Sequence, residues 1–274
     1  MAVVVVKLGG EVVAGPELPI VAADVAALSR RGDRVIVVHG GGPQATDLSR
    51  RLGIETRQVG GRRVTDAATL DVMKMVVAGK LNVDLCAALL AAGIRPVGLH
   101  GASGLVVEAV KRPPRVVSGG GPDPIDFGHV GDVIGFNTHL LGTLWSAGYV
   151  PVLACLGADG LGHTYNINAD IVGNQLASNL GADHLFLVTS TPGVLRDVKD
   201  PSSRLALLTA EGARQAIADG TVTGGMIPKL EEAIAVLDGG VKSIHIVGRL
   251  QPGDLVREID APGTVGTTLT MRDS

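Results

Sequence analysis

The chain has 274 residues, and 46% of them are apolar, which is enough to build the core of one large domain or two modest ones. Its net charge of −3 and its scattered Lys and Arg side chains exclude the basic stripe that attracts nucleic acid. No apolar run approaches the roughly 18 residues of a membrane span, and residues 1–6 are too short for a secretory signal, so we expect a cytoplasmic protein without a membrane partner.

Short apolar runs rich in β-branched residues alternate along the chain with longer periodic stretches. The runs predict buried strands over residues 2–6, 34–38, 96–99, 150–155, 184–188 and 243–247. The stretches predict helices over residues 18–31, 43–52, 66–92, 137–147, 170–180 and 229–237, many of them followed by a glycine (32, 53, 93, 148, 181 or 239). Such alternation predicts an α/β fold, a three-layer α/β/α sandwich with a mainly parallel open sheet.

The region 105–133 departs from this alternation. Strand-like pieces at 105–110 and 115–118 are interrupted by prolines at 113 and 114 and by glycines at 119–121, which predicts antiparallel hairpins flanking a site. No linker divides the chain, so we expect two lobes of one continuous sheet that meet near residue 160. A ligand crevice should then lie along the carboxyl ends of the strands.

Two predicted strands end in glycine-rich segments. The first strand ends in KLGG (residues 7–10), where Lys7 stands beside glycines whose backbone amides are free to bind a phosphate. The second ends in HGGGP (residues 39–43), with Pro43 suited to the first turn of a helix. Each segment also has a plainer interpretation. Lys7 would mark the point where a buried strand reaches solvent, and the three glycines of HGGGP would form a tight turn. Neither is a Walker loop or a GxGxxG fingerprint, and His39 is more typical of a strand end than of a base.

Three further segments place polar residues at predicted helix starts. In GGRRVTD (residues 60–66), Thr65 or Asp66 can cap the next helix, and the arginines either clamp a substrate carboxylate or are simply solvated. In NINAD (residues 166–170), three polar side chains exceed what one helix cap requires. In TGGMIPK (residues 223–229), Pro228 places Lys229 in the first turn of a helix, where a cation is disfavoured by roughly 0.3–1 kcal/mol unless an anion docks there.

Other reaction classes lack their motifs. The seven histidines show no HExxH or HxxxH spacing and there is no GxSxG elbow, which argues against hydrolysis by a metal or a serine. The two cysteines, Cys86 and Cys155, form no CxxC pair and are expected to be buried thiols. One Trp, two Tyr and three Phe are too few for a platform that stacks nucleic-acid bases.

Together, the five segments resemble the amino-acid kinase family over residues 3 to about 270. Their variants KLGG, HGGGP, GxRVTD, NINAD and TGGMIPK resemble those of the acetylglutamate kinases within it. The resemblance implies an enzyme that transfers the γ-phosphoryl group of ATP to the side-chain carboxylate of N-acetyl-L-glutamate, giving N-acetyl-L-glutamyl 5-phosphate in arginine biosynthesis. It also implies Mg²⁺ carried by the nucleotide, with no metal site of the protein's own.

The resemblance assigns a role to individual residues. Catalysis falls to Lys7 and Lys229, which stabilise the transferring phosphoryl group, and to Asp170, which orients both lysines. Substrate-binding residues are Gly41, Gly42, Arg63 and Asn166. Nucleotide-binding residues are Gly9, Gly10, Thr189, Ser190, Gly193, Val194, Leu195, Thr223 and Gly225. The lobe formed by residues 1–160 would bind the acyl amino acid and dimerise, and residues 161–274 would bind ATP. Because hexameric members carry a helix before the first strand and only six residues precede Lys7 here, a homodimer is expected.

The chemistry agrees with these roles. A carboxylate is already ionised at neutral pH, so phosphoryl transfer to it requires positioning and charge neutralisation rather than a general base. One departure from the family pattern is the sequence VTSTPG at residues 188–193, where the family usually has LTDVPG. Because Ser190 stands where the family has an aspartate, the sequence does not identify the group that replaces this acidic nucleotide contact.

Two other functions compete with this interpretation. A kinase for carrier-protein-linked α-aminoadipate in lysine biosynthesis tends to have HGGS and NTDGD, which differ from the segments here. A nucleotide-binding storage or regulatory protein of the same fold is the non-enzyme alternative, and the presence of Lys7, Asp170 and Lys229 argues against it. Aspartate kinases usually carry an additional regulatory domain, and uridylate kinases differ in the substrate motifs.

Overall fold

The computed structural model describes residues 1–197 and 199–272. Its main sheet has eight strands in the order β12, β14, β13, β11, β1, β2, β8, β5. These strands are β1 (Val3–Leu8), β2 (Arg34–His39), β5 (Pro96–Leu99), β8 (Val150–Ala154), β11 (His184–Val188), β12 (Leu207–Thr209), β13 (Ser243–Val247) and β14 (Thr267–Thr270). Neighbouring strands are parallel except β13 and β14. The mainly parallel sheet predicted from the sequence is confirmed.

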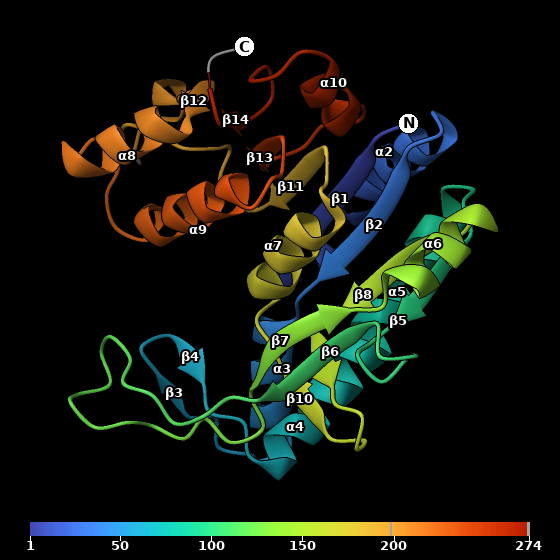
Figure 1. Ribbon diagram of the computed structural model, residues 1–274, viewed down its shortest axis with the longest axis vertical. Coiled ribbons are helices and arrows are strands. Elements are labelled where there is room, and N and C mark those ends of the chain that lie inside the picture. Colours follow the sequence, from blue (N-terminus) through green and yellow to red (C-terminus); the bar gives the residue numbers. More distant parts are fainter. Residues whose placement is uncertain (198, 273–274) are drawn as a thin grey trace.

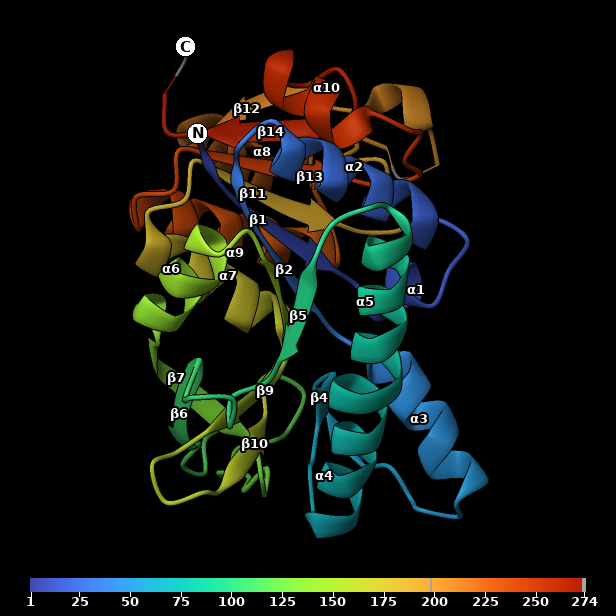
Figure 2. The same cartoon turned by 90° about the vertical axis from the view of Figure 1, so that its right-hand side faces the viewer.

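Helices cover both faces of this sheet, as the sequence predicts. Figure 2 shows α2, α5 and α10 on one side of the strands and α6, α7 and α9 on the other. The helices are α1 (Gly10–Val13), α2 (Leu18–Arg30), α3 (Gly42–Arg51), α4 (Ala67–Met73), α5 (Asn82–Ala91), α6 (Thr138–Ser146), α7 (Ala169–Leu180), α8 (Ala210–Ala218), α9 (Met226–Asp238) and α10 (Asp254–Asp260). A π-helical segment, η1 (Lys74–Leu81), joins α4 to α5, and η2 (Pro201–Ser203) is a 3₁₀ turn. No described helix is long and apolar enough to span a membrane.

The central strands carry continuous runs of apolar residues because both of their faces are covered. Val4, Val5 and Val6 of β1 are fully buried, and so are Val37 and Val38 of β2. The six strands and six helices predicted from the main alternation are all present, with ends that shift by at most three residues. The elements α8, α10, β12 and β14 in the last quarter of the chain were not predicted.

A second sheet, in the order β10, β9, β6, β7, stands beside the main one. Its strands are β6 (Val107–Lys111), β7 (Gly131–Phe136), β9 (Leu156–Ala158) and β10 (Thr164–Asn166), and β3 (Gln58–Val59) forms a separate hairpin with β4 (Arg62–Arg63). β6 confirms the strand predicted over residues 105–110, but its antiparallel partner is β7, which was not predicted. The strand predicted over residues 115–118 is wrong, since only a single bridge joins Arg115 to Ile125. Prolines at 113 and 114 lack the N–H groups of a ladder.

The main sheet joins the two halves of the chain. Strands from residues 3–154 and strands from residues 184–270 occupy separate parts of it and meet where β1 pairs with β11 (Figure 1). The carboxyl ends of β1 and β2 point toward the second sheet and the β3–β4 hairpin. The exact division into two lobes near residue 160 stays a prediction.

Candidate active site

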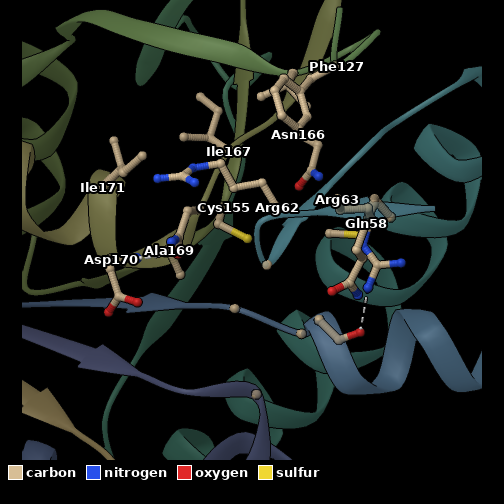
Figure 3. Close-up of a pocket in the computed structure, with 18 of the residues that line it drawn as sticks. Gln58, Arg62, Arg63, Phe127, Cys155, Asn166, Ile167, Ala169, Asp170 and Ile171 are labelled. Atoms are coloured by element: carbon tan, nitrogen blue, oxygen red, sulfur yellow. Dashed lines mark hydrogen bonds between the residues drawn. The ribbon is translucent and has the colours of Figure 1, made fainter. Parts of the chain in front are cut away.

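A cavity of about 730 Å³ opens at the carboxyl ends of β1 and β2. The site residues predicted from the sequence that line it are Lys7, Gly9, Gly10, Gly41, Gly42, Arg63, Asn166 and Asp170. Side chains from β4, from the loop before β7, from the end of β10 and from the start of α7 face one another across it (Figure 3). Four of the five motif segments, far apart in the sequence, therefore contribute to one site, whereas residues 223–229 do not line it and α9 contributes Glu232 instead.

Lys7 is held at this cavity by an ion pair. It is the next-to-last residue of β1, it is 7% exposed, and its ammonium contacts the carboxylate of Asp170 in the first turn of α7. The helix can approach the strand because residue 173 is a glycine, where a Cβ would lie only 3.2 Å from Lys7 Cβ. The ion pair fixes a cation where a phosphoryl group can reach it.

The two glycine-rich strand ends are in direct contact. A Cβ at Gly10 would lie 3.0 Å from Gly41 Cα and 2.7 Å from Gln44 Oε1, so a larger residue would push the two loops apart. Gln44 Nε2 donates to Gly10 O at 3.0 Å and holds the first loop on α3. Because α3 begins at Gly42, the N-terminus of this helix and its free amides face the cavity, an arrangement that favours anions.

Arg63 has the geometry of a carboxylate clamp. Its Nη2 donates to Gly42 O at 3.0 Å and to Thr46 Oγ1 at 2.7 Å, which fixes the guanidinium at the start of α3. Its Nη1 is buried and has no hydrogen-bond partner among the described residues. Burial lowers the pKa of Arg63, and an anion in the cavity would compensate for that desolvation.

The three polar residues of NINAD have three different roles. Asn168 accepts a hydrogen bond from Asp170 N at 3.0 Å and caps α7. Asp170 pairs with Lys7, and Asn166 lines the cavity with its Nδ2 bonded to Thr65 Oγ1 at 3.0 Å. The cap of α4 is Asp66, which accepts from Thr69 N at 2.8 Å. The excess of polar groups in this segment therefore reflects site residues in addition to a cap.

His39 is a buried residue at a strand end, and of the two cysteines predicted to be buried, Cys155 is buried and Cys86 is half-buried. His39 is fully buried, bonds through its ring nitrogens to Gly40 O and Asn82 Nδ2, and does not line the cavity. Burial lowers the pKa of His39 to about 4, so the imidazole is neutral. Burial raises the pKa of Cys86 to about 11 and that of Cys155 to about 12, which keeps both as thiols, although Cys155 borders the cavity.

Several cavity residues were missed by the sequence analysis. They are Gln58, Met73, Arg112, Arg115, Phe127, Cys155 and Glu232. Arg112 is 6% exposed and its Nε donates to Asp132 Oδ1 at 2.7 Å. Burial and the neighbouring charge of Arg112 lower the pKa of Arg115. No motif marks these positions, and only an excess of basic residues at 111–115 signals them in the sequence.

Of the residues assigned to the nucleotide, Gly9 and Gly10 line this cavity, and the others lie outside it. Ser190, Thr223 and Gly225 are exposed, and Thr189 bonds to Thr191 within its own loop. Gly193 and Leu195 belong to the same loop, and Leu195 forms a single antiparallel β-bridge with Arg204. Val194 is fully buried, donates to Thr267 Oγ1 at 2.8 Å and accepts from Leu205 N at 2.8 Å, so we expect it to support the loop rather than contact a nucleotide.

Lys229 is half-buried in α9 and also lies outside the cavity lining. The helix begins at Met226, two residues before Pro228, so Lys229 is its fourth residue rather than its first or second. One turn further along α9, Glu232 does line the cavity. Among residues 1–197 and 199–272, no group of three or more His, Cys, Asp or Glu side chains is arranged to hold a metal ion.

Relatives with nearly the same length share most of this sequence. The chain is 65% identical over 265 residues to the acetylglutamate kinase of Sorangium cellulosum (strain So ce56), covering 97% of this chain and 93% of that protein. It is 62% identical over 269 residues to the acetylglutamate kinase of Anaeromyxobacter dehalogenans (strain 2CP-C), covering 98% of this chain and 100% of that protein.

Solved structures share the fold. N-acetylglutamate synthase from Neisseria gonorrhoeae, complexed with coenzyme A and N-acetyl-glutamate, matches with a TM-score of 0.82 and 26% identity over 100% of this chain and 60% of that one. Carbamate kinase from Giardia lamblia, bound to AMP-PNP, matches with a TM-score of 0.68 and 16% identity, covering 99% of each chain. The model of the amino acid kinase family matches residues 2–248. The chain belongs to the amino acid kinase family.

Proposed function

We propose that this chain is an acetylglutamate kinase, which transfers the γ-phosphoryl group of ATP to the side-chain carboxylate of N-acetyl-L-glutamate in arginine biosynthesis. Full-length relatives at 60–65% identity carry that name. The structural observation that carries the proposal is one cavity whose cations include Lys7, paired with Asp170, and Arg63, whose Nη1 has no partner among the described residues. A substrate with two carboxylates fits such a cavity, one end held and the other reacting.

The reaction requires no proton transfer to the protein. An oxygen of the ionised side-chain carboxylate forms a bond to the γ-phosphorus, while the bond from that phosphorus to the β,γ-bridging oxygen breaks and ADP leaves with the electron pair. Lys7 neutralises charge on the transferring group, and Asp170 keeps the lysine in place. Arg63 holds the other carboxylate away from the reacting one, so two anions do not meet in the same place.

ATP would approach from the side of α9 and the β11 loop. The positions of Thr189, Ser190, Thr223 and Gly225 beyond the carboxyl end of β11 and before α9 support this placement. Lys229 would reach the phosphates after the two halves close, since in this structure it lies outside the cavity lining. Mg²⁺ would arrive on the nucleotide and supply charge neutralisation for the phosphates.

The test is to measure ATP consumption with N-acetyl-L-glutamate, L-glutamate and α-aminoadipate side by side, trapping the acyl phosphate with hydroxylamine. We expect turnover with N-acetyl-L-glutamate well above that with the other two acids. Turnover only with aminoadipate derivatives would replace the proposed substrate. ATP binding without turnover of any acid would favour the storage or regulatory alternative.

We also propose a homodimer in the cytoplasm. Its support is a row of exposed apolar side chains, Met75 of η1 with Val83 and Leu90 of α5, which are 51%, 63% and 60% exposed. They lie at intervals of about two helical turns, and exposed apolar surface of this kind is typical of a contact between proteins. Light scattering of the purified protein should give twice the chain mass, and Leu90→Lys should lower it.

A further inference from the structure

Arg62 of β4 and Glu232 of α9 border the cavity but take no part in the reaction as described. They belong to segments 170 residues apart, since β4 lies in the first quarter of the chain and α9 in the last. Arg62 stands next to the proposed carboxylate clamp, Arg63, yet the two arginines differ in their surroundings. Arg63 is fixed by Gly42 O and Thr46, whereas among residues 1–197 and 199–272 the Arg62 side chain bonds only to Gly60 O of its own hairpin, at 3.3 Å.

The Arg62 side chain extends toward the part of the cavity where Glu232 lies. Figure 3 shows it pointing to the side of Ile171 and Asp170, with Arg63 on the opposite side. Glu232 borders a second cavity together with Ile171 and Asn174 of α7. Asn174 Nδ2 donates to Glu232 Oε2 at 3.3 Å, so the carboxylate faces the middle of α7. The two charges therefore face the same region from opposite halves of the chain.

Neither charge has an ionic partner in this arrangement. No carboxylate among the described residues lies within 4.0 Å of the Arg62 guanidinium, and no Lys or Arg nitrogen lies that close to Glu232. The pKa of Glu232 is raised, first by desolvation and then by the charge of Asp170, and Lys7, Asn174 and Arg62 only partly offset this rise. An ionised Glu232 beside Lys7 and Asp170 would repel the phosphates of an incoming nucleotide.

We propose that Arg62 and Glu232 form an ion pair across the cavity when its two sides close on the substrates. This inference rests on the proposed phosphoryl transfer. Arg62 then neutralises the carboxylate that would otherwise face the γ-phosphoryl group, and the pair holds β4 against α9. Both residues are positioning residues, because they act on the nucleotide through each other and do not touch the reacting atoms.

A double-mutant cycle with Arg62→Gln, Glu232→Gln and the double variant tests the pair. Arg62→Gln leaves Glu232 unneutralised and should raise the KM for ATP about tenfold, a size typical of coupled neighbours. Glu232→Gln removes the repulsive charge together with the pair and should change that KM less than about threefold. The double variant should recover to the level of Glu232→Gln, because no carboxylate remains to be neutralised.

Matched controls come from the same two elements and their neighbourhood. Glu231, next to Glu232 on α9, is exposed and does not line the cavity, so Glu231→Gln should not rescue Arg62→Gln. Arg57 is the matched control for Arg62, because it is exposed just before β3 and does not line the cavity. Arg57→Gln should therefore leave the KM for ATP unchanged. The reversed pair, Arg62→Glu with Glu232→Arg, should restore most of the activity that Arg62→Glu alone removes. Thermal unfolding of each variant separates misfolding from loss of the pair.

The result that overturns the inference is a double variant as impaired as Arg62→Gln alone, since Arg62 would then bind the phosphates directly. Failure of the reversed pair to improve on Arg62→Glu would count equally against it. Calorimetric Kd values for MgATP in the same variants report on the pair even if N-acetyl-L-glutamate is not turned over. A wild-type protein that does not turn over N-acetyl-L-glutamate would refute the proposed function. The ion pair would still be supported if the Kd values for MgATP showed that the double variant binds as well as Glu232→Gln.

Discussion

The substitution Arg63→Lys separates substrate holding from chemistry. Arg63 Nη2 donates to Gly42 O and Thr46 Oγ1, and Nη1 remains available to a ligand. A lysine has a single nitrogen with which to make all three contacts. A hydrogen bond to a charged group contributes about 1.5–3 kcal/mol. With about 1.4 kcal/mol for each factor of ten, the KM for N-acetyl-L-glutamate should rise roughly 10- to 100-fold. The kcat should change by less than about threefold, because the lost contact exists equally in the ground state and the transition state.

The assay is a set of initial rates against N-acetyl-L-glutamate at saturating ATP. Arg57→Lys provides the matched control, since Arg57 is an exposed arginine of the same region that does not line the cavity. It should leave both kinetic constants unchanged. If Arg63→Lys lowered kcat and left the KM for the acid unaltered, Arg63 would contact the transferring phosphoryl group, and the reasoning from its fixed position beside α3 would be refuted.

Three further predictions concern the reacting cation, the loop contact and a buried histidine. Lys7→Met should lower kcat by about 100-fold or more with a smaller change in either KM; steady-state rates showing only a KM effect would contradict the role of Lys7. Gly10→Ala should lower the free energy of unfolding by about 1–3 kcal/mol, because the added Cβ would lie 3.0 Å from Gly41 Cα. Urea denaturation measures this loss, and Gly42→Ala is the control because its Cβ would enter open space. His39 stays neutral down to a pKa of about 4 in the folded protein but protonates near pH 6.5 when unfolded, so its contribution to stability is lost as pH falls from 6.5 toward 4. Between pH 7 and pH 5 the wild type should therefore lose about 2 kcal/mol more than His39→Gln does, and equal losses would show that His39 is not the group responsible.

Sequence patterns predicted the fold class because the strands of a parallel sheet are buried on both faces. The run of valines in β1 can be accommodated only in such a position, and it proved fully buried from Val4 to Val6. The short terminal strands β12 and β14 have no such run. Thr267 and Thr268 are buried polar residues that bond to Leu205 O and Glu258, so their burial depends on partners that periodicity does not identify.

About half of the cavity lining was visible as motifs. Lys7, the glycines of the two loops, Asn166 and Asp170 stand at strand ends or helix starts, where local sequence predicts exposed backbone and a charged side chain. Arg112, Phe127 and Glu232 lie in segments with ordinary local features. They reach the cavity because the second sheet and α9 are folded over the strand ends, which is a matter of long-range packing.

The sequence by itself determined the alternation of strands and helices, the places where glycine must follow a strand, and the residue types that suit phosphoryl transfer. These depend on local sterics and on burial of continuous apolar runs. Only the tertiary structure decided that Lys7 pairs with Asp170, that Arg63 keeps one nitrogen free, and that Arg62 and Glu232 face the same cavity. Such relations join residues up to about 170 positions apart, and their distances are set by how α7 and α9 pack on the sheet.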